Sequence, residues 1–176
     1  WGMAGFKVAS ADFTNHSFLT ALAGCGKPLI ASTGMATEQE ISAGVRHLRG
    51  LGVGFALLHC NSTYPTPFKD VNLRYLSRLR ELAQAPVGYS GHERGIAVPI
   101  AAVAMGAQVI EKHLTLDPAM EGNDHKVSLR PEEFKAMVEG IRAVEESLRM
   151  FRAFAHFRRT ATRDVEIGGR TIEEGD

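Results

Sequence analysis

Short apolar segments alternate with amphipathic segments along most of this chain, and this alternation limits the fold more than any other feature. The apolar segments have the length of β-strands, and the segments between them have the length and periodicity of helices. The expected strands are apolar on both faces, as buried strands of a parallel sheet are. The alternation therefore predicts an α/β protein with a parallel sheet and right-handed crossovers.

The expected strands are Phe6–Ser10, Pro28–Thr33, Phe55–Cys60, Val87–Ser90 and Val109–Leu114. The expected helices are Asn15–Gly24, Thr37–Leu51, Val71–Ala83, Ile96–Gly106 and Pro131 to about Arg149. Thr37 and Glu40 have the spacing of a capping box at the start of a helix. These strand–helix units fit a small doubly wound sheet or part of an eight-unit barrel. No glycine-rich phosphate-binding motif follows the first strand, which favours a partial (β/α)8 TIM barrel.

Composition excludes several classes of partner. The chain has 20 basic and 20 acidic residues and a net charge of zero, so neither nucleic acid nor an anionic membrane is an expected partner. No apolar run reaches membrane-spanning length, and the N-terminus lacks a signal-peptide pattern. Cys25 and Cys60 match no metal-binding motif. We therefore expect a cytoplasmic protein.

Two histidines, His92 and His113, follow neighbouring strands of the expected sheet. The carboxyl ends of parallel strands share one edge, where the catalytic groups of α/β folds collect. Two neutral imidazoles at that edge can hold a divalent metal and leave positions open for substrate. Alternatively, one histidine caps a turn and the other is solvated. For the pair, we favour the metal.

Polar residues recur at the same edge. Lys7 lies within an apolar strand, so it either pairs with an anion or protects an exposed sheet edge from aggregation. Ser10, Ser62 and Ser90 follow or end strands and could donate to phosphate or carboxylate oxygens. A single serine at the end of a strand is more often part of a turn. The assignment to ligand binding therefore depends on the recurrence of serines at the same edge of the sheet.

Two loops and one strand residue complete the candidate site. Tyr64 lies in a proline-rich loop that fits either a ligand-binding wall or a simple rigid connection. Glu111 shares side-chain parity with His113, so it either supports a ligand imidazole or pairs with a lysine. Asp124 lies in a polar loop after the His113 strand and is a candidate acid or base.

Long motifs in this order resemble the sialic acid synthases, which also make related nonulosonic acids. The stretches that carry the resemblance are Lys7–Ser10, Gly26–Met35, Leu57–Pro67, Gly88–His92, Ile110–Asp117 and Glu121–Lys126. The resemblance covers about residues 6–146 and implies that this chain supplies strands four to eight of a (β/α)8 barrel.

The resemblance also implies an activity, in which phosphoenolpyruvate condenses with N-acetylmannosamine or a related amino sugar. It implies that His92 and His113 are catalytic residues that bind a divalent metal, usually manganese. It assigns phosphate and carboxylate binding to Lys7, Ser10, Ser62 and Ser90, and contact with the amino sugar to Tyr64 and Asp124. Members of this family form dimers, so a homodimer is expected.

The chain also departs from the family pattern. Gly91 stands where the family usually has Asp, which predicts the loss of a carboxylate beside a metal ligand and a looser backbone. Asn123 stands where the family usually has Pro. Strands one to three, the family's first-strand glutamate and its antifreeze-like domain have no counterpart here. Unpaired sheet edges would be an aggregation hazard.

The tail resembles a second family, the haem-thiolate cytochrome monooxygenases. Glu146 and Arg149 form an E-x-x-R pair on a helix, and Asp164–Ile167 and Arg170–Ile172 flank a Gly-Gly hairpin turn. The cysteine loop that would ligate haem is not present, so no haem is predicted. We interpret residues 1–148 as the barrel part and residues 149–176 as an unrelated tail joined near Val144–Leu148.

Three interpretations remain open at this point. The chain is a synthase module that is active with its missing part, or a non-catalytic half-barrel that binds a metal or phosphorylated ligand. In the third interpretation it is a chimeric product with no function alone.

Overall fold

The computed structural model describes residues 2–154, 165–167 and 170–172. Contacts divide the chain into two compact units, residues 1–144 and residues 145–176. The distinction between a synthase part and an unrelated tail stays a prediction. Within the described ranges, no helix is both long and apolar enough to cross a membrane.

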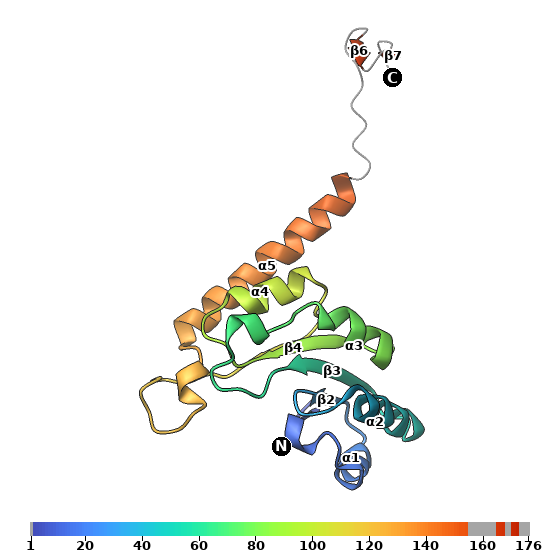
Figure 1. Cartoon of the computed structure of the whole chain (residues 1–176), viewed down its shortest axis with the longest axis vertical. Helices are drawn as coiled ribbons and strands as arrows, with labels where there is room; N and C mark the ends of the chain where they lie inside the picture. The colour runs from blue at the N-terminus through green and yellow to red at the C-terminus, as the bar shows by residue number, and fades with distance from the viewer. Residues whose placement is uncertain (1, 155–164, 168–169, 173–176) are drawn as a thin grey trace. The chain divides into compact units, whose positions relative to one another are not determined.

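Strands and helices alternate through the first unit, as the sequence predicts (Figure 1). The strands are β1 (Phe6–Val8), β2 (Leu29–Ser32), β3 (Phe55–Cys60), β4 (Val87–Gly91) and β5 (Ile110–Lys112). The helices are α1 (His16–Ala23), α2 (Glu38–Gly50), α3 (Tyr75–Ala83), α4 (Ala97–Ala104) and α5 (Pro131–Phe154). Short 3-10 turns occupy Ser10–Asp12, Phe68–Asp70 and His125–Val127.

The strands are parallel and lie in the order β1-β2-β3-β4-β5. A doubly wound sheet reverses its strand order at a switch point, whereas a barrel adds each strand beside the one before it. The observed order therefore confirms a partial (β/α)8 barrel. The sheet curves enough to bring side chains of β1 and β5 together. Lys7 Nζ on β1 lies 3.3 Å from Glu111 Oε2 on β5.

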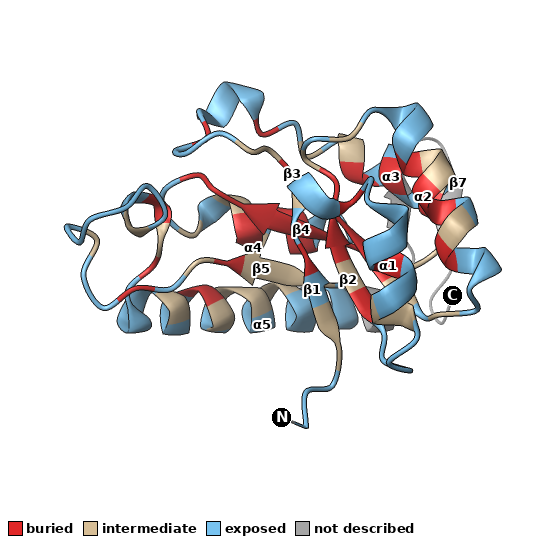
Figure 2. Cartoon of the chain, turned by 90° about the horizontal axis from the view of Figure 1, so that it is seen from below, coloured by how far each residue is buried: buried red, intermediate tan, exposed pale blue. Residues whose placement is uncertain are grey.

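The core lies between the sheet and its helices, where β3 and β4 are almost entirely buried (Figure 2). Phe13, Leu19, Leu48 and Leu57 are fully buried in one cluster. The predicted capping box of α2 is confirmed: the Thr37 amide donates to Glu40 Oε2 at 2.8 Å, and the Glu40 amide donates to Thr37 Oγ1 at 3.3 Å. These contacts fix where α2 begins after β2.

Several predicted boundaries are wrong by a few residues. Helix α3 begins at Tyr75 and not at Val71, because Asn72 adopts a left-handed φ of 48° that a helix cannot contain. Helix α5 continues to Phe154, past the predicted end at Arg149. Glu146 and Arg149 form an ion pair at the i,i+3 spacing that supports helices in general.

In the second unit, β6 (Val165–Ile167) pairs with β7 (Arg170–Ile172) as an antiparallel ladder. The predicted hairpin strands are thus confirmed. The predicted Gly168-Gly169 turn and residues 155–164 and 173–176 lie outside the described residues.

A buried histidine, His59, links β3 to the segment before α3. Its Nε2–H donates to the Val71 carbonyl at 2.7 Å, and its ring packs against Tyr75 and Tyr89 at centroid distances of 5.4 and 5.9 Å. Burial lowers the pKa of His59 below its ordinary value of 6.5, although the backbone carbonyls of Val71 and Asn72 oppose this shift. The folded chain therefore favours neutral His59.

His59→Gln is expected to reduce the loss of stability in mild acid. Because the folded-state pKa is depressed, the unfolded chain binds more protons just below pH 6.5, and the free energy of unfolding falls as pH falls through the folded-state pKa. One such group contributes at most about 1.4 kcal/mol per pH unit. Urea denaturation between neutral pH and pH 5 measures both slopes. Equal slopes in the two proteins would contradict the assignment.

Candidate functional site

A cavity of about 270 Å³ lies at the carboxyl edge of the sheet. It receives residues from every strand of the sheet or the loop that follows it. All of the site residues predicted from the sequence line it except Asp124: Lys7, Ser10, Ser62, Tyr64, Ser90, His92 and His113. The rule that parallel strands end at one edge predicts this position for the histidines and serines, whereas Lys7 was left with an alternative and the role of Tyr64 came from the family resemblance.

The two imidazoles lie beside each other in this cavity. His92 follows β4 and His113 follows β5, and these strands are neighbours through the Gly91–Lys112 register pair. Their ring centroids are 5.1 Å apart, and the ring planes are nearly perpendicular at 87°. Neighbouring strands thus deliver both rings to one place, as their sequence positions predict.

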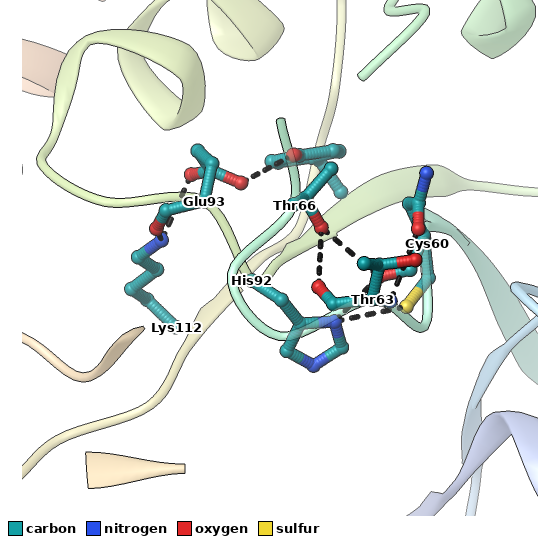
Figure 3. Close-up of polar contacts among 8 residues, drawn as sticks. Cys60, Thr63, Thr66, His92, Glu93 and Lys112 are labelled. Carbon is teal, nitrogen blue, oxygen red and sulfur yellow. Dashed lines mark hydrogen bonds and ion pairs between the residues drawn. The ribbon is translucent and has the colours of Figure 1, made fainter. Parts of the chain in front are cut away.

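Hydrogen bonding fixes the orientation of the His92 ring (Figure 3). Its Nδ1–H donates to the Asn61 carbonyl at 2.7 Å, and the Cys60 sulfur lies 3.7 Å from the same nitrogen. The other ring nitrogen points away from these contacts. A histidine held at Nδ1 by a carbonyl presents Nε2 to a ligand, which is a common arrangement of metal-binding histidines.

His113 is half-buried and is kept neutral by its surroundings. Burial lowers its pKa below 6.5, as does a positive charge on His92, and the carboxylates of Asp124 and Glu111 oppose them. Asp124 does not line the cavity. Its carboxylate is largely exposed, and Oδ1 lies 3.9 Å from His113 Nδ1, which is longer than a hydrogen bond.

An ion pair spans the cavity between the first and last strands. Lys7 Nζ lies 3.3 Å from Glu111 Oε2 and donates to the Val8 carbonyl at 2.8 Å. The structure confirms one of the two possibilities left open by the sequence, the pairing of Glu111 with a lysine, and Glu111 also lines the cavity. Glu111 Oε2 is buried and accepts no well-formed hydrogen bond from the described residues.

Several hydroxyl groups line the same cavity as Lys7. The Ser10 hydroxyl oxygen accepts a hydrogen bond from the Gly34 amide at 3.1 Å, which holds the turn after β1 against the turn after β2. Ser32, which was not singled out from the sequence, also lines the cavity. Its buried hydroxyl has no hydrogen-bond partner among the described residues, so it is free to bind an incoming group.

Tyr64 forms the wall beside the histidines. Its ring lies 4.0 Å from that of His92 and 6.1 Å from that of His113, measured between centroids. Burial raises the pKa of its hydroxyl above 10.0, and the charges of Cys60, Asp124 and Glu111 act in the same direction. The phenol therefore stays protonated and can donate a hydrogen bond.

The donor set fits a divalent metal with an open coordination sphere. His92 has a free nitrogen, and the lowered pKa of His113 favours the neutral imidazole that metals require. No group of three or more histidine, cysteine or acidic side chains has metal-binding geometry in residues 2–154. Among these residues the candidate metal ligands are the two imidazoles, whose centroids lie 5.1 Å apart.

A buried network beside the site was missed from the sequence. The Tyr89 hydroxyl donates to Glu93 Oε2 at 2.5 Å, and Lys112 Nζ donates to Glu93 Oε1 at 2.9 Å. Burial raises the pKa of Tyr89, with the Glu93 hydrogen bond and charge acting likewise, and burial lowers the pKa of Lys112 against the attraction of Glu93.

This network corrects the expectation for Gly91. We expected a lost carboxylate and a loose backbone there, yet Gly91 is a buried residue of regular strand β4. A Cβ atom at this position would lie 2.7 Å from Glu93 Oε2 and 2.8 Å from Glu93 Oε1. A carboxylate from two residues further along the chain thus fills the space above Gly91.

Comparisons with known proteins agree with the fold. Residues 1–152 match the model of the NeuB family. The chain is 43% identical over 150 residues to the N,N'-diacetyllegionaminic acid synthase of Campylobacter jejuni, covering 84% of this chain and 45% of that protein. It is 42% identical over 144 residues to the human N-acetylneuraminate-9-phosphate synthase, covering 81% of this chain and 40% of that protein.

Solved structures give the same result. The N-acetylneuraminic acid (sialic acid) synthetase of Leptospira borgpetersenii, crystallised with citrate, superposes with a TM-score of 0.79 at 33% identity. The superposition covers 90% of this chain and 60% of that chain. The chain therefore spans less than half the length of the two sequence relatives, and about three-fifths of this solved chain.

Proposed function

Because the chain belongs to the NeuB family, we propose that its cavity serves the condensation of phosphoenolpyruvate with N-acetylmannosamine or a related amino sugar. In this reaction C3 of phosphoenolpyruvate bonds to the aldehyde carbon of the open-chain sugar, and the aldehyde oxygen gains a proton. Water adds to C2, and phosphate leaves from C2. The product is a nonulosonic acid.

The observation that carries the proposal is the combination of groups in one cavity: a lysine, several serine hydroxyls and two imidazoles. Lys7 is the only lysine or arginine among the described residues that line it. Phosphoenolpyruvate has a phosphate and a carboxylate, which need a cation and hydrogen-bond donors. We assign these anions to Lys7, Ser10, Ser62 and Ser90.

We propose that His92 and His113 hold a divalent metal, with manganese as the expected ion. When bound, such a metal polarises the carbonyl oxygen of the aldehyde. Tyr64 would orient the amino sugar with its ring and hydroxyl. Asp124, in the loop beside His113, would contact the amino sugar and is the candidate acid for the proton that the aldehyde oxygen gains. As in its family, the active protein is proposed to be a homodimer.

The test is an assay of phosphate release from phosphoenolpyruvate, with and without N-acetylmannosamine and manganese. Release that requires both additions supports the proposal, and the keto-acid product is identified by mass spectrometry. Binding of manganese without turnover would support the alternative, a non-catalytic half-barrel. The absence of both binding and turnover would support the third interpretation, a chimeric product with no function alone.

Lys7→Met tests the role assigned to the lysine. This change removes the charge that we assign to phosphoenolpyruvate but keeps the length of the side chain. We expect kcat/KM for phosphoenolpyruvate to fall roughly 30-fold or more, since a desolvated charge contact is worth at least about 2 kcal/mol. The KM for the amino sugar should change little. An unchanged KM and kcat for phosphoenolpyruvate would remove Lys7 from the site.

A further inference from the structure

We propose that the buried ion pair of Glu93 and Lys112 is a positioning pair, which sets the separation and orientation of the two imidazoles. This inference rests on the proposed function, in which those rings share a metal. Neither residue lines the cavity, so they would act through the histidines beside them.

The covalent positions of the pair give the first argument. Glu93 directly follows His92, and Lys112 directly precedes His113. Lys112 Nζ is 2.9 Å from Glu93 Oε1 and also donates to the Glu93 backbone carbonyl. One ammonium group thus ties together, by side chain and backbone, the two segments that carry the rings (Figure 3).

The burial of the pair gives the second argument. Both side chains are 0% exposed. A buried ion pair contributes little net stability compared with apolar residues of similar size, because desolvation offsets the attraction. Its value lies in specifying one arrangement, since ionic partners must meet where apolar side chains could shift. The Tyr89 hydroxyl restricts the arrangement further, because it donates a hydrogen bond to the second carboxylate oxygen of Glu93.

Gly91 gives the third argument. The carboxylate oxygens of Glu93 lie where a side chain at position 91 would begin, and Tyr89 Cε1 lies 2.8 Å from the same point. The glycine is therefore needed for Glu93 to reach Lys112 beneath the end of β4. Any side chain at position 91 would displace the carboxylate from its partner, so the two positions are coupled.

The variant that isolates positioning from charge is Glu93→Gln with Lys112→Met. It removes one negative and one positive charge, so the net charge near the histidines is unchanged. The control is Glu38→Gln, which breaks an ion pair with Arg78 on the outer helices. Circular dichroism and urea denaturation establish that each protein is folded.

The first measurement uses the metal-free chain. Long-range ¹H–¹⁵N NMR of the ring nitrogens should show a proton held on Nδ1 of His92 in the wild type and in the control. In the double variant the chemical shifts of the two His92 ring nitrogens should become more similar, because the hydrogen bond from Nδ1 to the Asn61 carbonyl is loosened. An unchanged His92 tautomer in the folded double variant would overturn the proposal.

The second measurement is the affinity for Mn²⁺ by titration calorimetry. Loss of an orienting contact typically weakens metal binding 10- to 100-fold. We expect about this loss in the double variant and none in the control. Should the wild type bind no Mn²⁺ while its ring signals respond as described, the metal assignment fails and the positioning pair stands.

If the double variant does not fold, Gly91→Ala replaces it. This variant keeps both charges and displaces the Glu93 carboxylate by sterics alone. The same change in the His92 ring signals is expected, and wild-type signals in a folded Gly91→Ala protein would refute the role of the pair.

Discussion

Replacing His92 with alanine is expected to abolish manganese-dependent phosphate release, with kcat/KM reduced roughly 10³-fold or more. The ring lies 5.1 Å from that of His113, and its Nδ1 is held by Asn61 so that Nε2 faces a ligand. A single remaining imidazole cannot chelate, and the proposed metal contributes several kcal/mol to transition-state stabilisation. Activity and Mn²⁺ affinity should therefore fall together.

His16→Ala is the matched control for this prediction. His16 is an exposed residue at the start of α1, and its ring stacks on that of His47 at a centroid distance of 4.5 Å, outside the cavity. We expect this variant to keep both activity and Mn²⁺ affinity. If His92→Ala retained wild-type Mn²⁺ affinity, the two-imidazole site would be wrong, whatever the effect on turnover.

Gly88→Ala is expected to have the largest effect on folding, a loss of about 3 kcal/mol or more in the free energy of unfolding. Gly88 is buried in β4 between β3 and β5. A Cβ atom there would lie 2.2 Å from the Val109 carbonyl oxygen and 2.7 Å from Leu58 Cδ2. The backbone oxygen cannot move without disturbing the register of β5 and the position of His113.

Gly50→Ala provides the opposite case. Gly50 ends α2, has nothing within 4 Å of its Cβ direction and does not adopt a left-handed φ. Alanine there should stabilise the chain by up to about 1 kcal/mol, because it restricts the unfolded backbone. Urea denaturation compares the variants. Equal effects of the two substitutions would show that packing around Gly88 has been misread.

The architecture follows from local signals in the sequence. Strand β3 occupies Phe55–Cys60 as predicted, because a nearly continuous apolar run is bounded by Gly54 and Asn61. The strand-end rule then places the polar residues at one edge. The predicted ends of β1 and β5 were less accurate. Ser10 begins a 3-10 turn, and His113 lies beyond the residues of β5 that pair with β4.

The contacts missed from the sequence depend on three-dimensional packing. Glu93 and Lys112 meet because a glycine at position 91 leaves space for a carboxylate two residues away, which no linear pattern records. The Lys7–Glu111 pair depends on sheet curvature, since these strands are neighbours neither in the chain nor in the ladder. Asp124 lies in a loop, whose path strand periodicity does not determine.

The salt bridge across the cavity has a consequence for ligand selection. Because Glu111 already neutralises Lys7, an arriving anion must compete with a resident carboxylate for the same ammonium. A singly charged solute such as acetate or chloride offers no advantage over that internal competitor, whereas a dianionic phosphate ester does. A dianionic ligand is therefore better matched than a monoanion to an ammonium that already has a carboxylate partner.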